Sequence, residues 1–243
     1  PSDKGLGSAG WYNNIWFRQA AEQEGRIAIN LIGDAFSDAL RQQAIDAIRQ
    51  QLGQVDLVIY SLASGIRVLP DGRQVRSVLK TTGQPFSGWG LDLEQDALVQ
   101  QSLAAATPEE IRDTVTVMGG EDWQLWLQAL QQADCLAPGA QTVAYSYIGP
   151  ESTYPLYRDG TIGYAKEHLH ATAETINLQL AELGGHAWVS VCKALVTKAS
   201  AYIPVLPVYL GLLMGVMKER GVHEGCIEQM QRLFAAKMYG PNG

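Results

Sequence analysis

The stretch VDLVIYSL, residues 55–62, gives the clearest indication of the fold class. An apolar run this continuous is typical of a strand buried on both faces, as in a parallel sheet. Upstream, RIAINL (26–31) also predicts a buried strand. Between the two runs, 37–52 predicts a helix with Ser37 or Asp38 as its N-cap. The order strand, helix, strand favours an α/β fold with a parallel sheet.

The rest of the chain continues the alternation of strands and helices. TVAYSY (142–147) and HAWVSV (186–191) predict a third and a fourth strand. Between 64 and 105 the alternation stops, and PDG at 70–72 together with a Gly/Pro-rich stretch at 82–90 predicts an insertion with a hairpin or irregular structure. Helices are predicted over 11–24, 107–119, 121–134 and 161–183.

The composition is typical of a soluble globular protein, with 47% hydrophobic and 18% charged residues. At 243 residues we expect one large domain over 1–243. The net charge is −7 and no run of five basic residues occurs, so we expect no nucleic acid partner. Cys135, Cys192 and Cys226 have neither zinc nor disulfide spacing, which predicts free thiols in a cytoplasmic protein.

The segment 201–217 is nearly all apolar and has some features of a membrane span. It is shorter than the roughly 20 residues that a spanning helix needs. It also contains Pro204 and Pro207. We therefore expect a buried or ligand-facing pair of helices there, and no integral membrane segment.

Motifs typical of nucleotide-binding sites or metal sites are weak or missing in this sequence. Gly5, Gly7 and Gly10 have GxGxxG spacing but follow no strand, so we interpret them as a linker. His168 and His170 lie two residues apart on a predicted helix and point to different sides. We expect no metal site.

Tyrosines and a lysine gather around the third predicted strand. Tyr145 and Tyr147 lie at its carboxyl end, the edge at which open α/β sheets bind ligands. Tyr157 follows, and nine residues later Lys166 lies in the next helix. A phenol can donate a hydrogen bond to a carbonyl oxygen as negative charge builds there, and an ammonium lowers the phenol's pKa. On spacing alone, an ordinary edge of the core with a solvated lysine remains the favoured interpretation.

A resemblance strengthens the functional interpretation. The chain resembles the trans-2-enoyl-CoA reductase / FabV-type enoyl-ACP reductase family over about residues 9–239. This family is an enlarged relative of the short-chain dehydrogenases, so the resemblance implies a Rossmann-like parallel sheet flanked by helices. It rests on YSLAS (60–64), RSVLK (76–80), VMGGEDW (117–123), TVAYSYIGP (142–150), YRDGTIGYAKEHL (157–169), KALVTKAS (193–200) and HEGCIEQ (223–229).

The resemblance also implies a set of site residues. Tyr157 and Lys166 match the family's Tyr-x8-Lys pattern. Tyr157 would polarise the substrate carbonyl and act as acid, assisted by Tyr147, and both tyrosines would bind the substrate. Lys166 would activate the phenol and bind the cofactor ribose. Further NADH contacts are implied for Asp34, Ala35, Ser61, Leu62, Ala63, Val196 and Thr197. The segment 201–217 would form part of an acyl tunnel, within a helical region over 201–239.

The activity implied is NADH-dependent reduction of the carbon–carbon double bond of a trans-2-enoyl-CoA or enoyl-ACP in fatty acid biosynthesis, by a monomer. One alternative is a carbonyl reductase of the short-chain type, although its Tyr-x3-Lys is absent around 157–170. The other is a catalytically inactive nucleotide-binding fragment.

The fragment alternative arises because the family's chains extend beyond both ends of this one. The resemblance places the family's glycine-rich phosphate loop and first two strands before residue 1. In the strand order 3-2-1-4-5-6 those strands lie between 26–31 and 55–62. We therefore expect a gap in the sheet between these two stretches.

Overall fold

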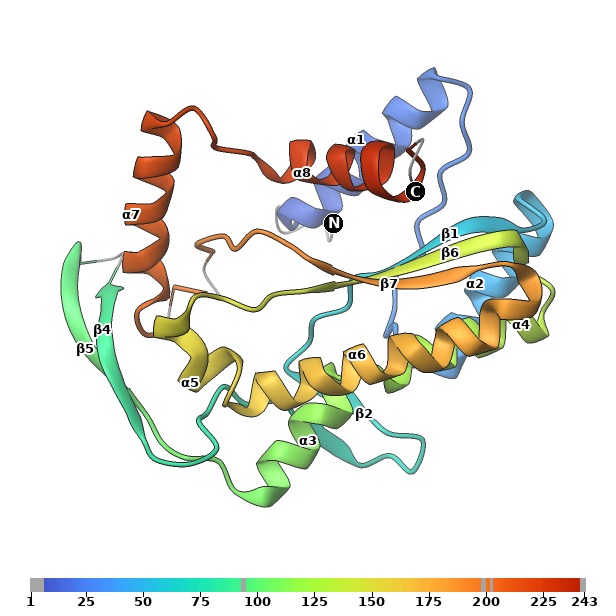
Figure 1. The fold of residues 1–243 in the computed structure, drawn as a ribbon. Coiled ribbons are helices and arrows are strands. Elements are labelled where there is room, and N and C mark those ends of the chain that lie inside the picture. The colour runs from blue at the N-terminus through green and yellow to red at the C-terminus, as the bar shows by residue number, and fades with distance from the viewer. Residues whose placement is uncertain (1–6, 93–94, 198–199, 202, 241–243) are drawn as a thin grey trace.

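A parallel sheet lies at the centre of the computed structural model (Figure 1). Its three strands follow the order β1 (Val55–Tyr60), β6 (Leu136–Ser146) and β7 (His186–Val191). β6 is buried along most of its carboxyl-terminal half, as expected for a middle strand. These strands confirm three of the four predicted ones and the α/β class. The structure describes residues 7–92, 95–197, 200–201 and 203–240.

Helices cover one face of this sheet (Figure 1). Two helices begin at capping side chains: Ser37, one of the two predicted caps, accepts from the backbone of Leu40, and Thr107 forms a capping box with Glu110. The core between sheet and helices includes Trp123 and Leu127. This core includes residues of α2 (Asp38–Gln51), α4 (Glu121–Gln132) and α6 (Thr161–Leu180), whereas α3 (Pro108–Met118) packs against α6.

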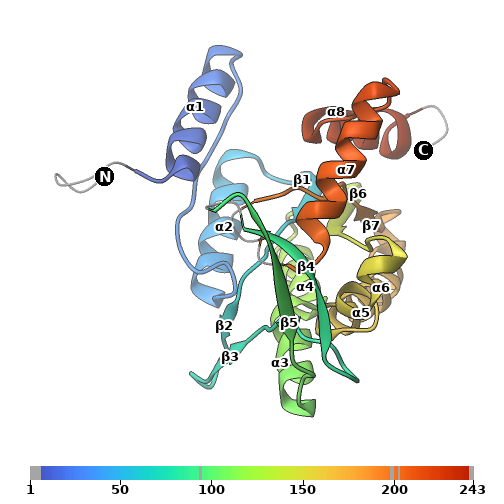
Figure 2. The ribbon, with the colours of Figure 1, turned by 90° about the vertical axis from the view of Figure 1, so that its left-hand side faces the viewer.

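Two hairpins occupy much of 64–105, which confirms the predicted break in the alternation. β2 (Ile66–Val68) pairs with β3 (Gln74–Arg76), and β4 (Phe86–Asp92) pairs with β5 (Ala97–Leu103). Figure 2 shows the β4–β5 hairpin beside α7 (Leu206–Glu219).

The remaining helical elements complete the secondary structure of the described residues. They are α1 (Ala9–Gln23), α5 (Tyr154–Tyr157), α8 (Cys226–Arg232), two 3-10 turns (Glu151–Thr153 and Ala181–Leu183) and a π-helical segment (Leu233–Met238). Gly10 lies inside α1, so the linker prediction is wrong there. Gly5 lies outside the described residues.

The predicted buried strand at 26–31 is wrong. These residues form no strand, and Ile27 and Ile29 are exposed at 59% and 45%. A buried strand needs partners for its backbone groups on both edges. Within the described ranges β1 pairs only with β6, so the edge of β1 that could lead toward 26–31 is open. The sequence at 26–31 has the apolar pattern of a strand, but no described residue pairs with it.

The apolar segment 201–217 contains one helix rather than the predicted pair. α7 begins at Leu206 with Pro207 in its first turn, where a missing N–H costs nothing. Pro204 lies outside the helix, before Val205, which has a φ of 68°. In the part of the chain that the structure describes, no helix has the length and apolar character to cross a membrane.

Candidate active site

The carboxyl edge of the central sheet gathers the ends of its three parallel strands (Figure 1). Tyr147 directly follows β6, the middle strand. Residues 61–63 directly follow β1, and Val196 and Thr197 follow β7 after a short stretch. Ligands of open α/β sheets bind at such an edge, between loops that leave neighbouring strands.

A tight turn carries the chain from Tyr147 to Tyr157. Gly149 has a φ of 79°, a conformation that favours glycine. A Cβ at this position would lie 2.4 Å from Thr153 Oγ1. The Thr153 hydroxyl in turn donates to Pro150 O at 2.8 Å. The turn therefore allows α5 to fold back and to bring Tyr157 against Tyr147.

The three predicted catalytic residues share one cavity. The rings of Tyr147 and Tyr157 meet edge to face, with 5.0 Å between their centroids. Both line a cavity of about 320 Å³ together with Lys166 from α6 and with Tyr154 and His170. The structure thus brings together side chains that span twenty residues of sequence.

Burial determines the protonation of these groups. Burial, and to a smaller extent Tyr147, raises the pKa of Tyr157 above its ordinary value. Burial and the nearby Tyr209 raise the pKa of Tyr147. Both phenols therefore keep their protons at neutral pH and can donate hydrogen bonds.

The effect of Lys166 on Tyr157 stays a prediction. The pKa of Tyr157 is raised, with burial as the largest cause and Tyr147 as the second. Burial also lowers the pKa of Lys166 itself. Its ammonium makes no hydrogen bond to the described residues, so its donors remain available to a ligand.

A second, larger cavity adjoins the first through Tyr147 and Ile148, which line both. Its volume is about 450 Å³. Most of its wall is apolar, and one face of α7 contributes Leu210, Leu213, Met214 and Met217. A cavity of this size and character can hold an extended hydrocarbon chain.

Sequence reasoning missed several polar residues of the second cavity. They are Lys193, Tyr209, Glu224 and Gln229. Lys193 is held in place because its ammonium donates to Glu224 O and its N–H donates to Gln229 Oε1. The spacing of apolar residues on α7 could have indicated which face of this helix is buried, but not which residues that face contacts.

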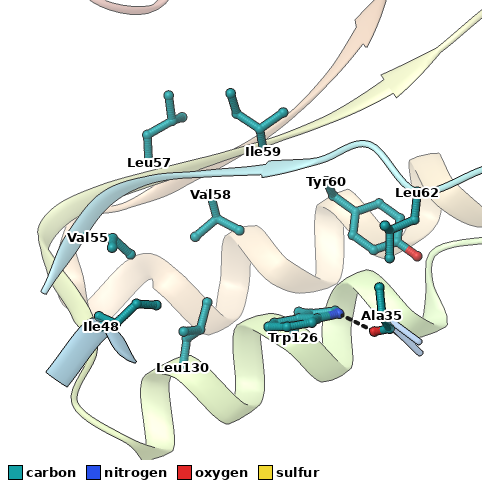
Figure 3. Close-up of a pocket in the computed structure, with 10 residues that line it drawn as sticks. All are labelled: Ala35, Ile48, Val55, Leu57, Val58, Ile59, Tyr60, Leu62, Trp126 and Leu130. Carbon is teal, nitrogen blue, oxygen red and sulfur yellow. Dashed lines mark hydrogen bonds between the residues drawn. The ribbon is translucent and has the colours of Figure 1, made fainter. Parts of the chain in front are cut away.

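A third cavity, of about 300 Å³, lies along β1, and the side chains of β1 that line it point to both faces of the sheet (Figure 3). Two predicted cofactor residues, Ala35 and Leu62, line one end of it, beside the ring of Trp126. Its walls are almost entirely aliphatic and aromatic, so they suit one face of a planar base. Asp34 lies next to this end and accepts a hydrogen bond from Phe36 N at 3.0 Å.

The other predicted cofactor residues line none of these three cavities. Ser61, Ala63 and Thr197 are exposed near the carboxyl edge, and Val196 is 37% exposed. Among the described residues, no group of three or more His, Cys, Asp or Glu side chains could hold a metal ion.

The residues present fit a dinucleotide. An apolar slot for a base ends near Ala35 and Leu62, and the free ammonium of Lys166 suits ribose hydroxyls. Both features adjoin loops that follow the carboxyl ends of parallel strands. Sheet and site together define a Rossmann-like α/β protein with a tyrosine–lysine centre.

Comparison with known proteins gives the family. The family model described as trans-2-enoyl-CoA reductase catalytic region matches residues 5–239. The chain therefore belongs to the trans-2-enoyl-CoA reductase family.

Relatives of known sequence and structure agree with this assignment. An enoyl-[acyl-carrier-protein] reductase [NADH] 2 of Photobacterium profundum is 55% identical over 100% of this chain and 61% of its own length. The trans-2-enoyl-CoA reductase of Clostridium acetobutulicum in complex with NAD has a TM-score of 0.96 at 46% identity, over 99% of this chain and 62% of that one. The Treponema denticola enzyme in complex with NAD has a TM-score of 0.93 at 49% identity, over 98% and 59%. The chain thus spans about three fifths of the length of the relatives it matches.

Proposed function

We propose that the protein reduces the carbon–carbon double bond of a trans-2-enoyl-CoA or enoyl-ACP with NADH. The observation that carries this proposal is the junction of two cavities at Tyr147: one holds Tyr157 and Lys166, and the other is apolar. A thioester head at the junction would reach both phenols while its acyl chain lies along α7. The names of the relatives, which include NADH and NAD, support the choice of substrate and cofactor.

The mechanism depends on hydrogen bonds to the thioester oxygen. NADH, when bound, supplies the hydride that the β-carbon accepts. Tyr157 and Tyr147 donate hydrogen bonds to the thioester oxygen as it becomes enolate-like. Tyr157 then acts as the acid, so that a proton reaches the α-carbon and the saturated thioester forms. Because both phenols are partly buried and protonated, their O–H dipoles are preorganised toward developing charge. Lys166 would hold the cofactor ribose beside them.

Several finer assignments belong to this proposal. Residues 1–243 would lie in one reductase domain with 64–105 as an insertion, and 201–239 would supply the acyl tunnel. The residues that would contact NADH from loops around the carboxyl edge are Asp34, Ala35, Ser61, Leu62, Ala63, Val196 and Thr197. All three cysteines are free thiols, which supports a cytoplasmic location. We further propose that the protein is a monomer.

The test is NADH oxidation with crotonyl-CoA, followed by absorbance. It uses two forms: the 243-residue chain, and the same chain joined to the flanking segments of the Photobacterium profundum relative. Tyr157→Phe should lower turnover by at least roughly 100-fold, the usual effect of removing one donor to developing charge. Tyr164→Phe is the matched control, because Tyr164 lies on α6, is 45% exposed and lines none of the three cavities.

Each outcome separates the candidate functions. Turnover in the 243-residue chain would show that it is active as it stands. Turnover only in the joined form would show that the flanking segments supply something that the reaction requires. Equal rates for Tyr157→Phe and the unaltered protein would remove Tyr157 from the mechanism. Reduction of a ketone but not of crotonyl-CoA would favour the carbonyl reductase alternative, and NADH binding without any turnover would favour the inactive nucleotide-binding protein.

A further inference from the structure

The loop before α2 is tied to α4 through one indole. Trp126 Nε1 donates a hydrogen bond to Ala35 O at 3.1 Å, across 91 residues of sequence (Figure 3). The next residue, Phe36, is held from another side, because the Arg67 guanidinium lies 5.5 Å from the centre of its ring. The loop carries Asp34 and Ala35, which the proposed function places against the cofactor.

Trp126 is itself fixed by a buried ion pair. The Arg41 guanidinium lies 5.4 Å from the centre of the indole ring. Its Nη2 also donates to Asp122 Oδ1 at 2.9 Å, and both side chains are at least 93% buried. A planar guanidinium that stacks on an aromatic ring and pairs with a carboxylate has little freedom to move.

The same network reaches the end of β1. Tyr60 is the last residue of that strand, and its hydroxyl donates to Asp122 Oδ2 at 3.2 Å. The next residues along the chain are Ser61 to Ala63, the second segment that the proposed function places against the cofactor. One set of contacts, centred on Asp122, therefore holds the loop with Ala35 and the segment after β1 relative to each other.

We propose that Trp126 is a positioning residue for the adenine side of the cofactor. Its indole N–H holds the Ala35 carbonyl, and this fixes the loop at the end of the cavity that Ala35, Leu62 and Trp126 line. The proposal rests on the proposed function, since it needs a dinucleotide at this end of the cavity. It assigns Trp126 to binding of the nucleotide half that does not react.

The test compares two tryptophans of α4. Trp126→Phe keeps an aromatic ring but removes the N–H. Trp123→Phe is the matched control, because Trp123 Nε1 also donates a hydrogen bond, to Thr142 Oγ1 at 2.8 Å, but contacts the sheet rather than the loop. Calorimetry in the joined form measures the Kd values of NADH, ADP-ribose and nicotinamide mononucleotide for each variant.

Trp126→Phe should raise the Kd of NADH and of ADP-ribose about fivefold, the effect of one neutral hydrogen bond. The Kd of nicotinamide mononucleotide should stay the same, and KM for NADH should rise with kcat changed less than twofold. Trp123→Phe should lower the unfolding temperature and leave all three Kd values unchanged.

Other results would overturn the proposal. Equal Kd values for Trp126→Phe and the unaltered protein would show that the loop needs no help from the indole. An equal rise in Trp123→Phe would show a general loosening of α4. If the unaltered protein bound neither NADH nor ADP-ribose, the cofactor assignment itself would fail, which is distinct from a failure of Trp126 alone.

Discussion

The phenol ring of Tyr147 meets that of Tyr157 edge to face, with centroids 5.0 Å apart and ring planes at 83°. Neither hydroxyl makes a hydrogen bond to the described residues, although burial raises the pKa of both groups. Both hydroxyls therefore remain available as donors to a ligand in the cavity that the two rings line.

This arrangement predicts that removing either hydroxyl lowers turnover without lowering the stability of the fold. Tyr147→Phe and Tyr157→Phe should unfold at the same temperature as the unaltered protein or higher, because each removes a hydroxyl that has no partner. Turnover should fall, by roughly 100-fold for Tyr157→Phe. Thermal unfolding and NADH oxidation measured on the same samples check both parts. A lower unfolding temperature in both variants would mean that the hydroxyls stabilise the fold.

The turn at Gly149 predicts an effect on the site that another glycine should not show. Gly149→Ala and Gly139→Ala both place a Cβ on a residue with positive φ, 79° and 77°, which costs about 1 kcal/mol each. Only at Gly149 would the Cβ also meet Thr153 Oγ1, at 2.4 Å, whereas at Gly139 it would meet nothing within 4 Å. Urea unfolding should show a loss of roughly 3 kcal/mol for Gly149→Ala.

Turnover separates the two glycine variants further. Gly149→Ala should slow the reaction, since Thr153 and the Tyr147 ring must move to admit the new methyl group. Gly139→Ala should react at the unaltered rate. Equal stability and equal rates in both variants would contradict the role of the turn.

The sequence predicted the central sheet because its signals are local. The runs at 55–60, 142–146 and 186–191 are β-branched and bounded by turns or helices, so each is recognisable without its neighbours. The run at 26–31 has the same local pattern, but a strand forms only where a partner pairs with it. The sequence of the run does not show whether such a partner exists, and this is why the strand predicted at 26–31 was wrong.

The candidate site was predicted less completely, for a related reason. Tyr157 and Lys166 could be found from their spacing and the resemblance. Tyr209 could not be found in this way. It lies on α7, and α7 is positioned by a contact between residues far apart in the sequence: Val205 N donates a hydrogen bond to Trp89 O of β4 at 2.9 Å. The rise in the pKa of Tyr157 was also beyond sequence reasoning, since burial is set by the whole fold.

The buried pair of Arg41 and Asp122 predicts a non-additive loss of stability. Asp122→Leu should cost roughly 3 to 5 kcal/mol, because it leaves the guanidinium in the core without its buried carboxylate. The double variant Arg41→Met with Asp122→Leu should recover much of that loss, since two apolar side chains then fill the site. Urea unfolding of the single and double variants measures the coupling. A double variant as unstable as the sum of the singles would show that the two charges do not depend on each other.

The lowered pKa of Lys166 predicts that the free energy of unfolding changes with pH. Burial lowers the pKa of Lys166 in the folded protein, so the unfolded chain binds a proton more readily at this position. Below the folded pKa the buried charge costs stability in full, and the cost falls as pH rises from there toward the unfolded pKa. Lys166→Met should therefore be more stable than the unaltered protein at pH 7, with a smaller difference at pH 10.5, the ordinary pKa of a lysine. Lys218→Met on the exposed end of α7 should show neither effect. Urea unfolding at the two pH values measures this difference in stability. If Lys166→Met were less stable than the unaltered protein at pH 7, the ammonium would have a stabilising partner.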